Sequence, residues 1–250
     1  MMNLNVKLPS VHLGLACLFI VFFITGCDDQ GDQNGGENQA NESKKLNGLK
    51  KSYYSKDKIK TAVNYKDGKK HGMSTSYYEN GNKQLEMPYN MGVREGISKK
   101  YYEKGTLYAE TPYVNGEIEG MRKTFFTNGT LKAETPYKYS LIGTGTLEYG
   151  TDGQPLSGYT LSVKQVSSIS EAGFPTFEVK LDRQCKKIIF YEGDLIDDRY
   201  LDEGQVVPLQ MSGSKGIFVN KYYEEDLNFI CKCNTMGGNV AIANIAVSYQ

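Results

Sequence analysis

The chain has 250 residues, with 29 basic and 29 acidic side chains, 27 Gly, 19 Tyr and no Trp. A formal net charge of zero gives no electrostatic support for nucleic-acid binding, because that binding depends on cationic contacts with phosphates. Tyr favours strands and Gly favours tight turns, so the composition favours an all-β protein of one or two folded units.

The first 26 residues have the pattern of a secretory signal peptide. Lys7 and His12 precede an apolar run over residues 13–24. That run is shorter than the stretch of about 20 residues that crosses a bilayer as a helix. We therefore expect residues 1–26 to be removed on export, with an uncleaved membrane anchor as the alternative.

The residues around the expected cleavage site suggest how the mature protein is held. Ile24, Thr25, Gly26 and Cys27 resemble the lipobox of bacterial lipoproteins. The resemblance implies that Cys27 is acylated and becomes the mature N-terminus. Two or more acyl chains anchor a protein stably, whereas one does not. The implied location is the bacterial cell envelope, at the inner or outer membrane, facing the periplasm or the cell surface.

A polar segment follows Cys27. Residues 28–43 include one Ala and no larger apolar side chain. Such a segment cannot bury enough surface to offset the entropy that it would lose on ordering. We expect residues 27–50 to form a lipidated, disordered tether.

The middle of the chain is a repeat. A 24-residue unit occurs four times over residues 53–148 without insertion or deletion, and its copies begin at Tyr53, Tyr77, Tyr101 and Phe125. A fixed period of this length marks an architecture in which each unit packs on its neighbours.

Each unit carries two turn signals and a strand-like alternation. Asn80-Gly81 is an example of the first turn and Asn115-Gly116 of the second, and both suit two-residue hairpins with positive φ. Residues 107–113 alternate between an apolar and a more polar face. We expect an elongated antiparallel meander of β-hairpins that gains two strands per unit.

Three segments of these units resemble a known family. Residues 65–72, 89–96 and 113–120 resemble MORN repeats, specifically the bacterial variant found in YwqK-type antitoxin proteins. The resemblance implies contacts with proteins or membranes. Asp57 in the first unit and Ser140 in the fourth replace turn glycines, and we interpret these two units as end caps.

Two aromatic columns recur through the units, and their members are the candidate binding residues. They are Tyr65, Tyr89, Tyr113 and Tyr137 in one column, and Tyr54, Tyr78, Tyr102 and Phe126 in the other. One interpretation is that the columns form the thin core of the sheet. The other is that one column is an exposed binding strip, since Tyr offers a large contact area with a polar tip.

Residues 155–250 follow a different pattern. Seven short β-rich segments alternate with clusters of Gly, Asp, Asn and Ser. This pattern predicts a small β-sandwich domain, with an immunoglobulin-like arrangement as one option. The same domain is a candidate to close the C-terminal edge of the repeat sheet.

Three cysteines of this domain form a possible disulfide site. Cys231 and Cys233 are two positions apart on one expected strand, so Cys185 could bridge either of them, with one thiol left over. Export to an oxidising compartment favours a disulfide. Buried free thiols are the main alternative, because a Cys-x-Cys metal or redox site lacks further ligands in the sequence.

Candidates for catalysis are few. His71 is the one histidine that follows the expected signal peptide, and it occupies a turn position. Adjacent carboxylates at Asp197-Asp198 and Glu224-Glu225 are typical of solvated loops. We expect no enzymatic activity, no cofactor and no metal site, and an envelope enzyme acting through the C-terminal domain is a third hypothesis.

The sequence favours a role in binding. Our leading hypothesis is an exported, lipid-anchored binding or scaffolding protein whose repeat sheet contacts a protein or cell-envelope partner, with the membrane held through the lipid on Cys27. The alternative is an immunity or antitoxin protein that neutralises a toxin by direct binding.

Overall fold

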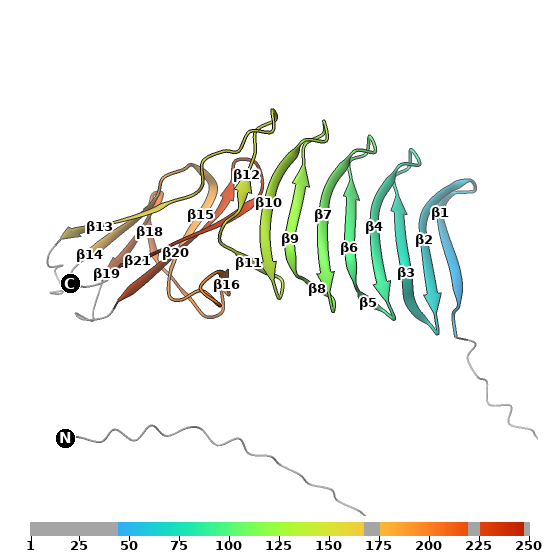
Figure 1. Ribbon diagram of the computed structural model, residues 1–250, viewed down its shortest axis with the longest axis horizontal. Coiled ribbons are helices and arrows are strands. Elements are labelled where there is room, and N and C mark those ends of the chain that lie inside the picture. The colour runs from blue at the N-terminus through green and yellow to red at the C-terminus, as the bar shows by residue number, and fades with distance from the viewer. Residues whose placement is uncertain (1–44, 168–175, 220–225, 248–250) are drawn as a thin grey trace, which may run out of the picture. The chain divides into compact units, whose positions relative to one another are not determined.

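The computed structural model describes residues 45–167, 176–219 and 226–247, which belong to one compact unit. Every helix or strand assigned in these ranges is a strand, which confirms the all-β prediction (Figure 1). In the same ranges, no helix has the length and apolar character needed to cross a membrane. The expected signal peptide, Cys27, Glu224-Glu225 and most of the expected tether lie outside the described residues.

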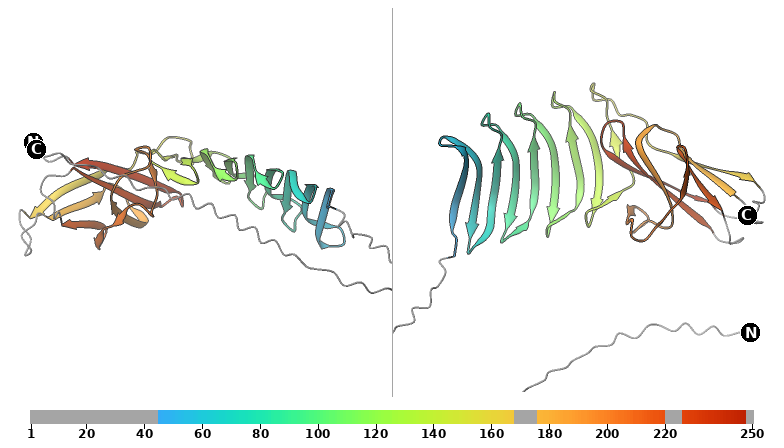
Figure 2. Two further views of the ribbon diagram at one scale, coloured as in Figure 1. Left: turned by 90° about the horizontal axis from the view of Figure 1, so that it is seen from below. Right: turned by 180° about the vertical axis from the view of Figure 1, so that it is seen from behind.

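The repeats form one antiparallel sheet, seen as a single layer in Figure 2. The strand order follows the chain from β1 to β11, and each unit adds two strands, as expected. Three short strands, β5, β8 and β12, pair beside this path. The strands are β1 (Gly48–Ser55), β2 (Lys58–Lys66), β3 (Lys69–Tyr77), β4 (Lys83–Asn90), β5 (Val93–Arg94), β6 (Gly96–Tyr101), β7 (Leu107–Val114), β8 (Glu117–Ile118), β9 (Gly120–Phe125), β10 (Leu131–Lys138), β11 (Leu141–Gly143), β12 (Leu147–Glu148) and β16 (Tyr200–Leu201).

The sheet starts earlier than the sequence suggested. β1 begins at Gly48, which lies opposite Tyr65 of β2. Residues 48–50 therefore belong to the sheet and not to the tether predicted over residues 27–50. The physical reason is that β2 offers these residues a continuous ladder of backbone partners, which a sequence window over the polar segment does not reveal.

Prolines lie where the strands that pair with β4 and β7 are interrupted. Pro88 of β4 lies opposite Met73 of β3 on one side, and on the other side the Glu95 N–H donates to the Pro88 carbonyl at 3.2 Å, between β5 and β6. The Glu119 N–H donates to the Pro112 carbonyl in the same way, also at 3.2 Å. Because proline has no N–H to donate, the ladder is broken at these positions, between β5 and β6 and between β8 and β9.

The turns that follow β2, β4, β7 and β10 are two-residue hairpins with positive φ, as expected. Met91 and Gly92, for example, have φ values of 46° and 94°. Tyr139 and Ser140 keep this conformation, with 50° and 63°, although Ser140 stands in the glycine position. A bond from the Ser140 N–H to the Ile118 carbonyl, at 3.0 Å, supports this last turn.

The other series of turns differs from the expected two-residue hairpin. Asn80 does not have positive φ, whereas Gly81 has a φ of 88°. The Tyr78 N–H donates to the Asn82 carbonyl at 2.8 Å, which closes a longer loop ending in a left-handed glycine. Asn80 Oδ1 accepts the Asn82 N–H at 3.0 Å, so this asparagine supports the loop through its side chain.

Two four-stranded antiparallel sheets form the C-terminal domain, with the orders β13-β14-β19-β18 and β17-β15-β20-β21. Lettered along the chain with β16 left out, these orders are A-B-E-D and C′-C-F-G, which is the arrangement of an immunoglobulin-type sandwich. The strands are β13 (Leu161–Ser167), β14 (Thr176–Leu181), β15 (Cys185–Glu192), β17 (Val207–Pro208), β18 (Gln210–Ser212), β19 (Lys215–Val219), β20 (Leu227–Thr235) and β21 (Val240–Val247).

The main hydrophobic core lies between these two sheets. Phe177 and Val179 of β14 and Phe229 and Cys231 of β20 are among its buried members. Their period of two along each strand places them on the faces by which the two sheets meet. The prediction of a β-sandwich is therefore confirmed.

The C-terminal end of the repeat sheet is closed by the chain that follows it. β11 pairs with β16, with Ile142 opposite Leu201 and Gly143 opposite Tyr200. A Cβ at position 143 would lie 2.9 Å from the Tyr200 ring, so glycine is required there. Ile142 packs on a second buried cluster that contains Leu201 and Ile242. This closure of the C-terminal edge was one of our expectations, whereas β1 at the other end is exposed along its whole length.

Candidate binding site

The hairpin turns of successive repeats are joined by hydrogen bonds. The Gly92 N–H donates to the Lys70 carbonyl at 2.7 Å, and the Gly116 N–H donates to the Arg94 carbonyl at 2.9 Å. In each of the four hairpins, a side chain 20 residues earlier in the chain accepts the N–H of the first turn residue. These acceptors are Asn47 for Asp67, His71 for Met91, Glu95 for Asn115 and Glu119 for Tyr139. His71 is thus part of the turn structure.

The column that begins at Tyr54 also ties repeats together. The hydroxyl groups of Tyr54, Tyr78 and Tyr102 donate to the carbonyls of Tyr77, Tyr101 and Phe125, at 3.0, 2.9 and 2.8 Å. Phe126, at the end of the column, has no hydroxyl and ends the series. These tyrosines therefore have a structural role that their spacing alone did not reveal.

Removing one of these hydroxyl groups should weaken the fold. Tyr78→Phe deletes a hydrogen bond to the Tyr101 carbonyl, and we expect it to lower the free energy of unfolding by about 1 kcal/mol. Tyr113→Phe is the control, because the Tyr113 hydroxyl makes no hydrogen bond to the described residues. Urea denaturation checks the result, and equal stability of the two variants would contradict the role of the hydroxyl.

The second column, Tyr65, Tyr89, Tyr113 and Tyr137, is half-buried. It shares a face of the sheet with small buried side chains, namely Ser98, Ala109, Thr124, Ala133 and Thr135. Lys70 and Arg94 lie over the rings of Tyr89 and Tyr113, 5.0 and 4.9 Å from the ring centroids. Burial raises the pKa of Tyr137. This packing agrees with the thin-core interpretation, and a binding role for either column stays a prediction.

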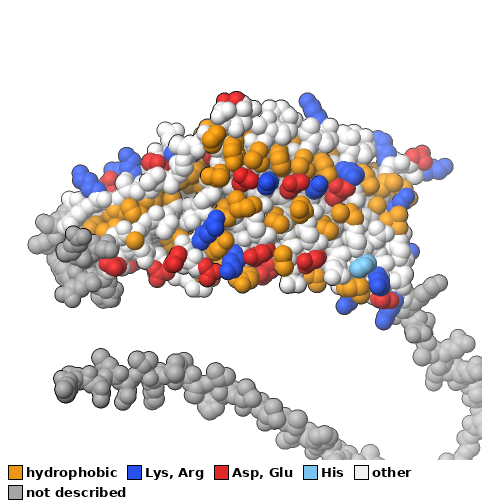
Figure 3. All heavy atoms as spheres, in the orientation of Figure 1, with side chains coloured by type: hydrophobic (Ala, Val, Ile, Leu, Met, Phe, Trp, Pro, Cys, Tyr) orange, Lys and Arg blue, Asp and Glu red, His pale blue; other side chains and the backbone are white. Residues whose placement is uncertain are grey.

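The opposite face carries a row of alternating charges. Its members, Glu86, Lys99, Glu110, Lys123 and Glu134, lie opposite one another on successive strands. The Lys99 Nζ lies 3.6 Å from Glu110 Oε1, and the Lys123 Nζ lies 3.3 Å from Glu134 Oε1. Figure 3 shows this line of alternating charges across the repeat strands, with hydrophobic side chains on both sides. Three glutamates and two lysines leave the row with one net negative charge, so the face has no strong net charge.

Large apolar side chains lie next to this charged row on the same face. Met73, Ile97 and Met121 are 43%, 53% and 39% exposed. Each lies opposite a proline of the neighbouring strand, at Pro88, Pro112 and Pro136 respectively. We call Met73, Ile97 and Met121 the apolar row. These side chains were not among the predicted site residues, although each member directly follows a glycine at the same point of the 24-residue unit.

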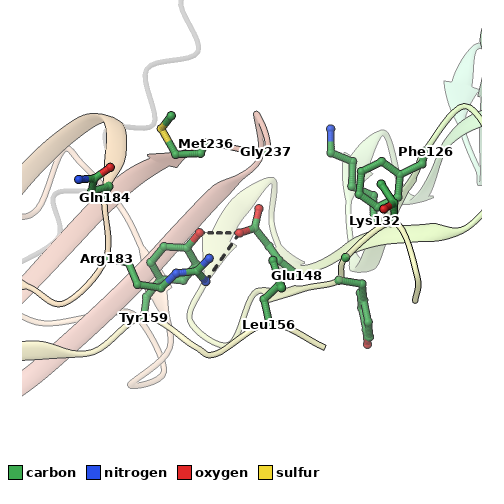
Figure 4. Close-up of a pocket in the computed structure, with 12 residues that line it drawn as sticks. Phe126, Lys132, Glu148, Leu156, Tyr159, Arg183, Gln184, Met236 and Gly237 are labelled. Atoms are coloured by element: carbon green, nitrogen blue, oxygen red, sulfur yellow. Dashed lines mark hydrogen bonds and ion pairs between the residues drawn. The ribbon is translucent and has the colours of Figure 1, made fainter. Parts of the chain in front are cut away.

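A buried carboxylate joins the last repeat to the sandwich. Glu148 of β12 is 6% exposed, and its Oε1 accepts hydrogen bonds from the Thr235 hydroxyl at 2.7 Å and the Asn239 amide at 2.8 Å. Its Oε2 accepts a bond from the Tyr159 hydroxyl at 2.5 Å and lies 3.9 Å from Arg183 (Figure 4). The geometry makes Glu148 a structural anchor with all its acceptors engaged.

The pKa of the Glu148 carboxyl reflects these contacts. Burial alone would raise it, but the hydrogen bonds from Tyr159, Asn239 and Thr235, together with the charge of Arg183, outweigh burial. The pKa is lowered from its ordinary value. Glu148 is therefore ionised at neutral pH and is not suited to act as a general acid there.

The cysteines and the remaining carboxylates have structural surroundings. Cys185 and Cys233 form a disulfide, and Cys231 is a buried free thiol whose pKa is raised to about 12 by burial. Asp197 lies 2.7 Å from Lys138, and Asp198 borders a cavity of only about 60 Å³. Among the described residues, no group of three or more His, Cys, Asp or Glu is placed to hold a metal ion.

The comparisons with known proteins concern the repeats. The MORN repeat variant matches residues 46–67, 70–91, 94–115 and 118–139, which are the strands and stacked turns described above. Residues 46–139 therefore contain four MORN repeats of this variant, and repeats of this kind typically mediate binding. A search of the curated proteins gives no match.

Proposed function

We propose that this protein is an exported, lipid-anchored binding or scaffolding protein and that its repeat sheet contacts a protein of the cell envelope. The apolar row carries the proposal. Its three side chains lie on one face at every second strand, about 9.6 Å apart at about 4.8 Å per strand. Exposed apolar groups arranged together on a surface favour a contact role.

The neighbouring charges favour a partner with modest net charge. Lys99 and Lys123 each lie near a glutamate of the adjacent strand, so an acidic partner would have to compete with Glu110 and Glu134. A protein segment with an apolar face and mixed polar flanks suits this surface better than nucleic acid does.

Anchoring through Cys27 is supported by the lipobox resemblance of residues 24–27 and by the disulfide between Cys185 and Cys233, a feature of exported proteins. Cys27→Ser should abolish labelling by radioactive palmitate and move the protein from the detergent phase to the aqueous phase in detergent partitioning. Unchanged partitioning would contradict the anchor.

An immunity or antitoxin role is the second candidate, and it is supported by the resemblance of the repeats to those of YwqK-type antitoxins. An antitoxin would use the same repeat surface as a scaffolding protein, but its partner would be a toxin. Capture of a toxin, with growth arrest when the repeat protein is deleted beside toxin-producing kin, would favour this role. Capture of an envelope protein without any growth defect would favour scaffolding.

Charge placed in the apolar row should abolish capture of the partner. We expect the double variant with Ile97→Asp and Met121→Asp to recover the partner from detergent-solubilised envelope at least about tenfold less well than the wild type, because two of the three apolar contacts of the row are lost. Val207→Asp, at a side chain 62% exposed on the sandwich, is the matched control. Equal recovery by the double variant and the wild type would overturn the proposed surface.

A further inference from the structure

A cavity of about 300 Å³ lies where the last repeat meets the sandwich (Figure 4). It is separate from the apolar row and uses other residues. Phe126, Lys132 and Tyr149 contribute to its lining from the repeat side, and Arg183 and Met236 contribute from the sandwich. A volume of this order is at the lower end of the range for small-ligand pockets.

The lining provides apolar contact for a ligand. Leu156 and Met236 are 45% and 61% exposed, although both border the cavity. Together with the ring of Phe126 they offer apolar surface that a ligand would cover. Covering such surface is favourable at about 25 cal/mol per Å². A ligand that fits here needs an aromatic or other apolar body.

Two cations give the cavity a positive character. Lys132 lies 5.5 Å from the centroid of the Phe126 ring and has no carboxylate partner among the described residues. The equivalent position is Gln84 in the second unit and Tyr108 in the third, whereas the first unit has Lys60, which lies 5.2 Å from the centroid of the Tyr54 ring. Arg183 lies over the Tyr159 ring, with its Cζ 4.5 Å from the ring centroid.

The buried carboxylate beside these cations does not cancel them. Glu148 lines the cavity, but its oxygens are engaged by Thr235, Asn239 and Tyr159, and it lies 3.9 Å from Arg183. Two cations and one carboxylate leave one net positive charge. Arg183 uses one N–H for the Ser157 carbonyl at 2.5 Å, and a guanidinium has five N–H donors in a planar fork that suits carboxylates.

We propose that this cavity binds a carboxylate joined to an aromatic or other apolar group. The apolar body would lie against Phe126, Leu156 and Met236, and the carboxylate would lie between Lys132 and Arg183. A phosphate monoester carries nearly two charges at neutral pH and matches one net positive charge less well. The ligand has two sources of the same chemistry, a free aromatic acid or the C-terminal residue of a polypeptide.

Calorimetric titration of the full chain in detergent tests the proposal with defined probes. N-acetylphenylalanine should bind at least about tenfold more tightly than its amide, which keeps the ring and lacks the charge. Equal affinity for the two probes, or no binding of the acid, would overturn the proposal. A further titration with Gly-Gly-Gly-Phe distinguishes the sources, because tighter binding than N-acetylphenylalanine indicates a polypeptide C-terminus and weaker binding indicates a free acid.

Substitutions locate the binding. Lys132→Met keeps the apolar stem of the side chain and removes its charge, and it should lower the affinity for N-acetylphenylalanine about tenfold. Lys123→Met is the matched control, because Lys123 lies beside Glu134 in the charged row outside this cavity. Equal effects of the two substitutions would contradict the site. Thermal unfolding of both variants shows whether they retain the fold.

Discussion

Replacing Glu148 by Ala is expected to lower the free energy of unfolding by about 3 kcal/mol. The substitution leaves the Thr235 hydroxyl and the Asn239 amide buried without their shared acceptor, and it also removes the acceptor of the Tyr159 hydroxyl. Each buried polar group that loses its partner costs about 1–3 kcal/mol. Chemical denaturation by urea measures the loss.

The control for this experiment is Glu110→Ala. Glu110 is paired with Lys99 on the exposed face, where an ion pair contributes about 0–1 kcal/mol. A loss at Glu148 no larger than the loss at Glu110 would contradict the role of Glu148 as the anchor between repeats and sandwich.

The effect of Glu148 should also depend on pH. Its pKa is lower in the folded protein than in the unfolded chain, so its contribution to stability is fully present above the unfolded value of about 4.3. The contribution is lost as the pH falls through the lower folded value. The difference in stability between the wild type and Glu148→Ala should therefore shrink below about pH 4, and a difference that grows there would contradict the sign of the shift.

Removing the disulfide should lower the free energy of unfolding by as much as Glu148→Ala does, or by more. Cys185 and Cys233 are separated by 48 residues in the chain. In the chain-entropy description, closing a loop of this length stabilises the fold by about 4 kcal/mol. The double variant with Cys185→Ala and Cys233→Ala should lose about that much stability in urea denaturation.

Two controls make this result specific. Cys231→Ala removes a buried sulfur without opening the crosslink, and we expect a smaller loss of about 1 kcal/mol. A reducing agent should destabilise the wild type by nearly the same amount as the double substitution and should leave the double variant unchanged. Full stability of the reduced wild type would contradict the contribution of the crosslink.

The repeat sheet could be predicted because its information is local. The turn glycines and the alternation of residues 107–113 lie within one 24-residue unit, and four copies remove ambiguity about the register. The boundary at Gly48 could not be predicted in the same way, because β1 depends on backbone partners in β2 rather than on its own composition.

The candidate sites were harder to predict from the sequence than the repeat sheet was. The hydroxyl bond from Tyr78 to the Tyr101 carbonyl depends on the spacing between units, so the recurrence of Tyr alone leaves its role open. Glu148 meets Thr235 and Asn239 over 87 and 91 residues, and no local pattern joins them. The apolar row was within reach, because Ile97 and its counterparts recur at a constant spacing after glycine, but the aromatic columns are the more prominent pattern.

Photo-crosslinking in intact cells tests most directly whether the repeat sheet is a contact surface. A photoreactive amino acid would be placed at Ile97, at Met121 and, as a control, at Val207 of the sandwich. We expect the first two positions to capture the same envelope protein and Val207 to capture none. Absence of any crosslinked protein at Ile97 and Met121, or the same products from Val207, would contradict a contact role for this face.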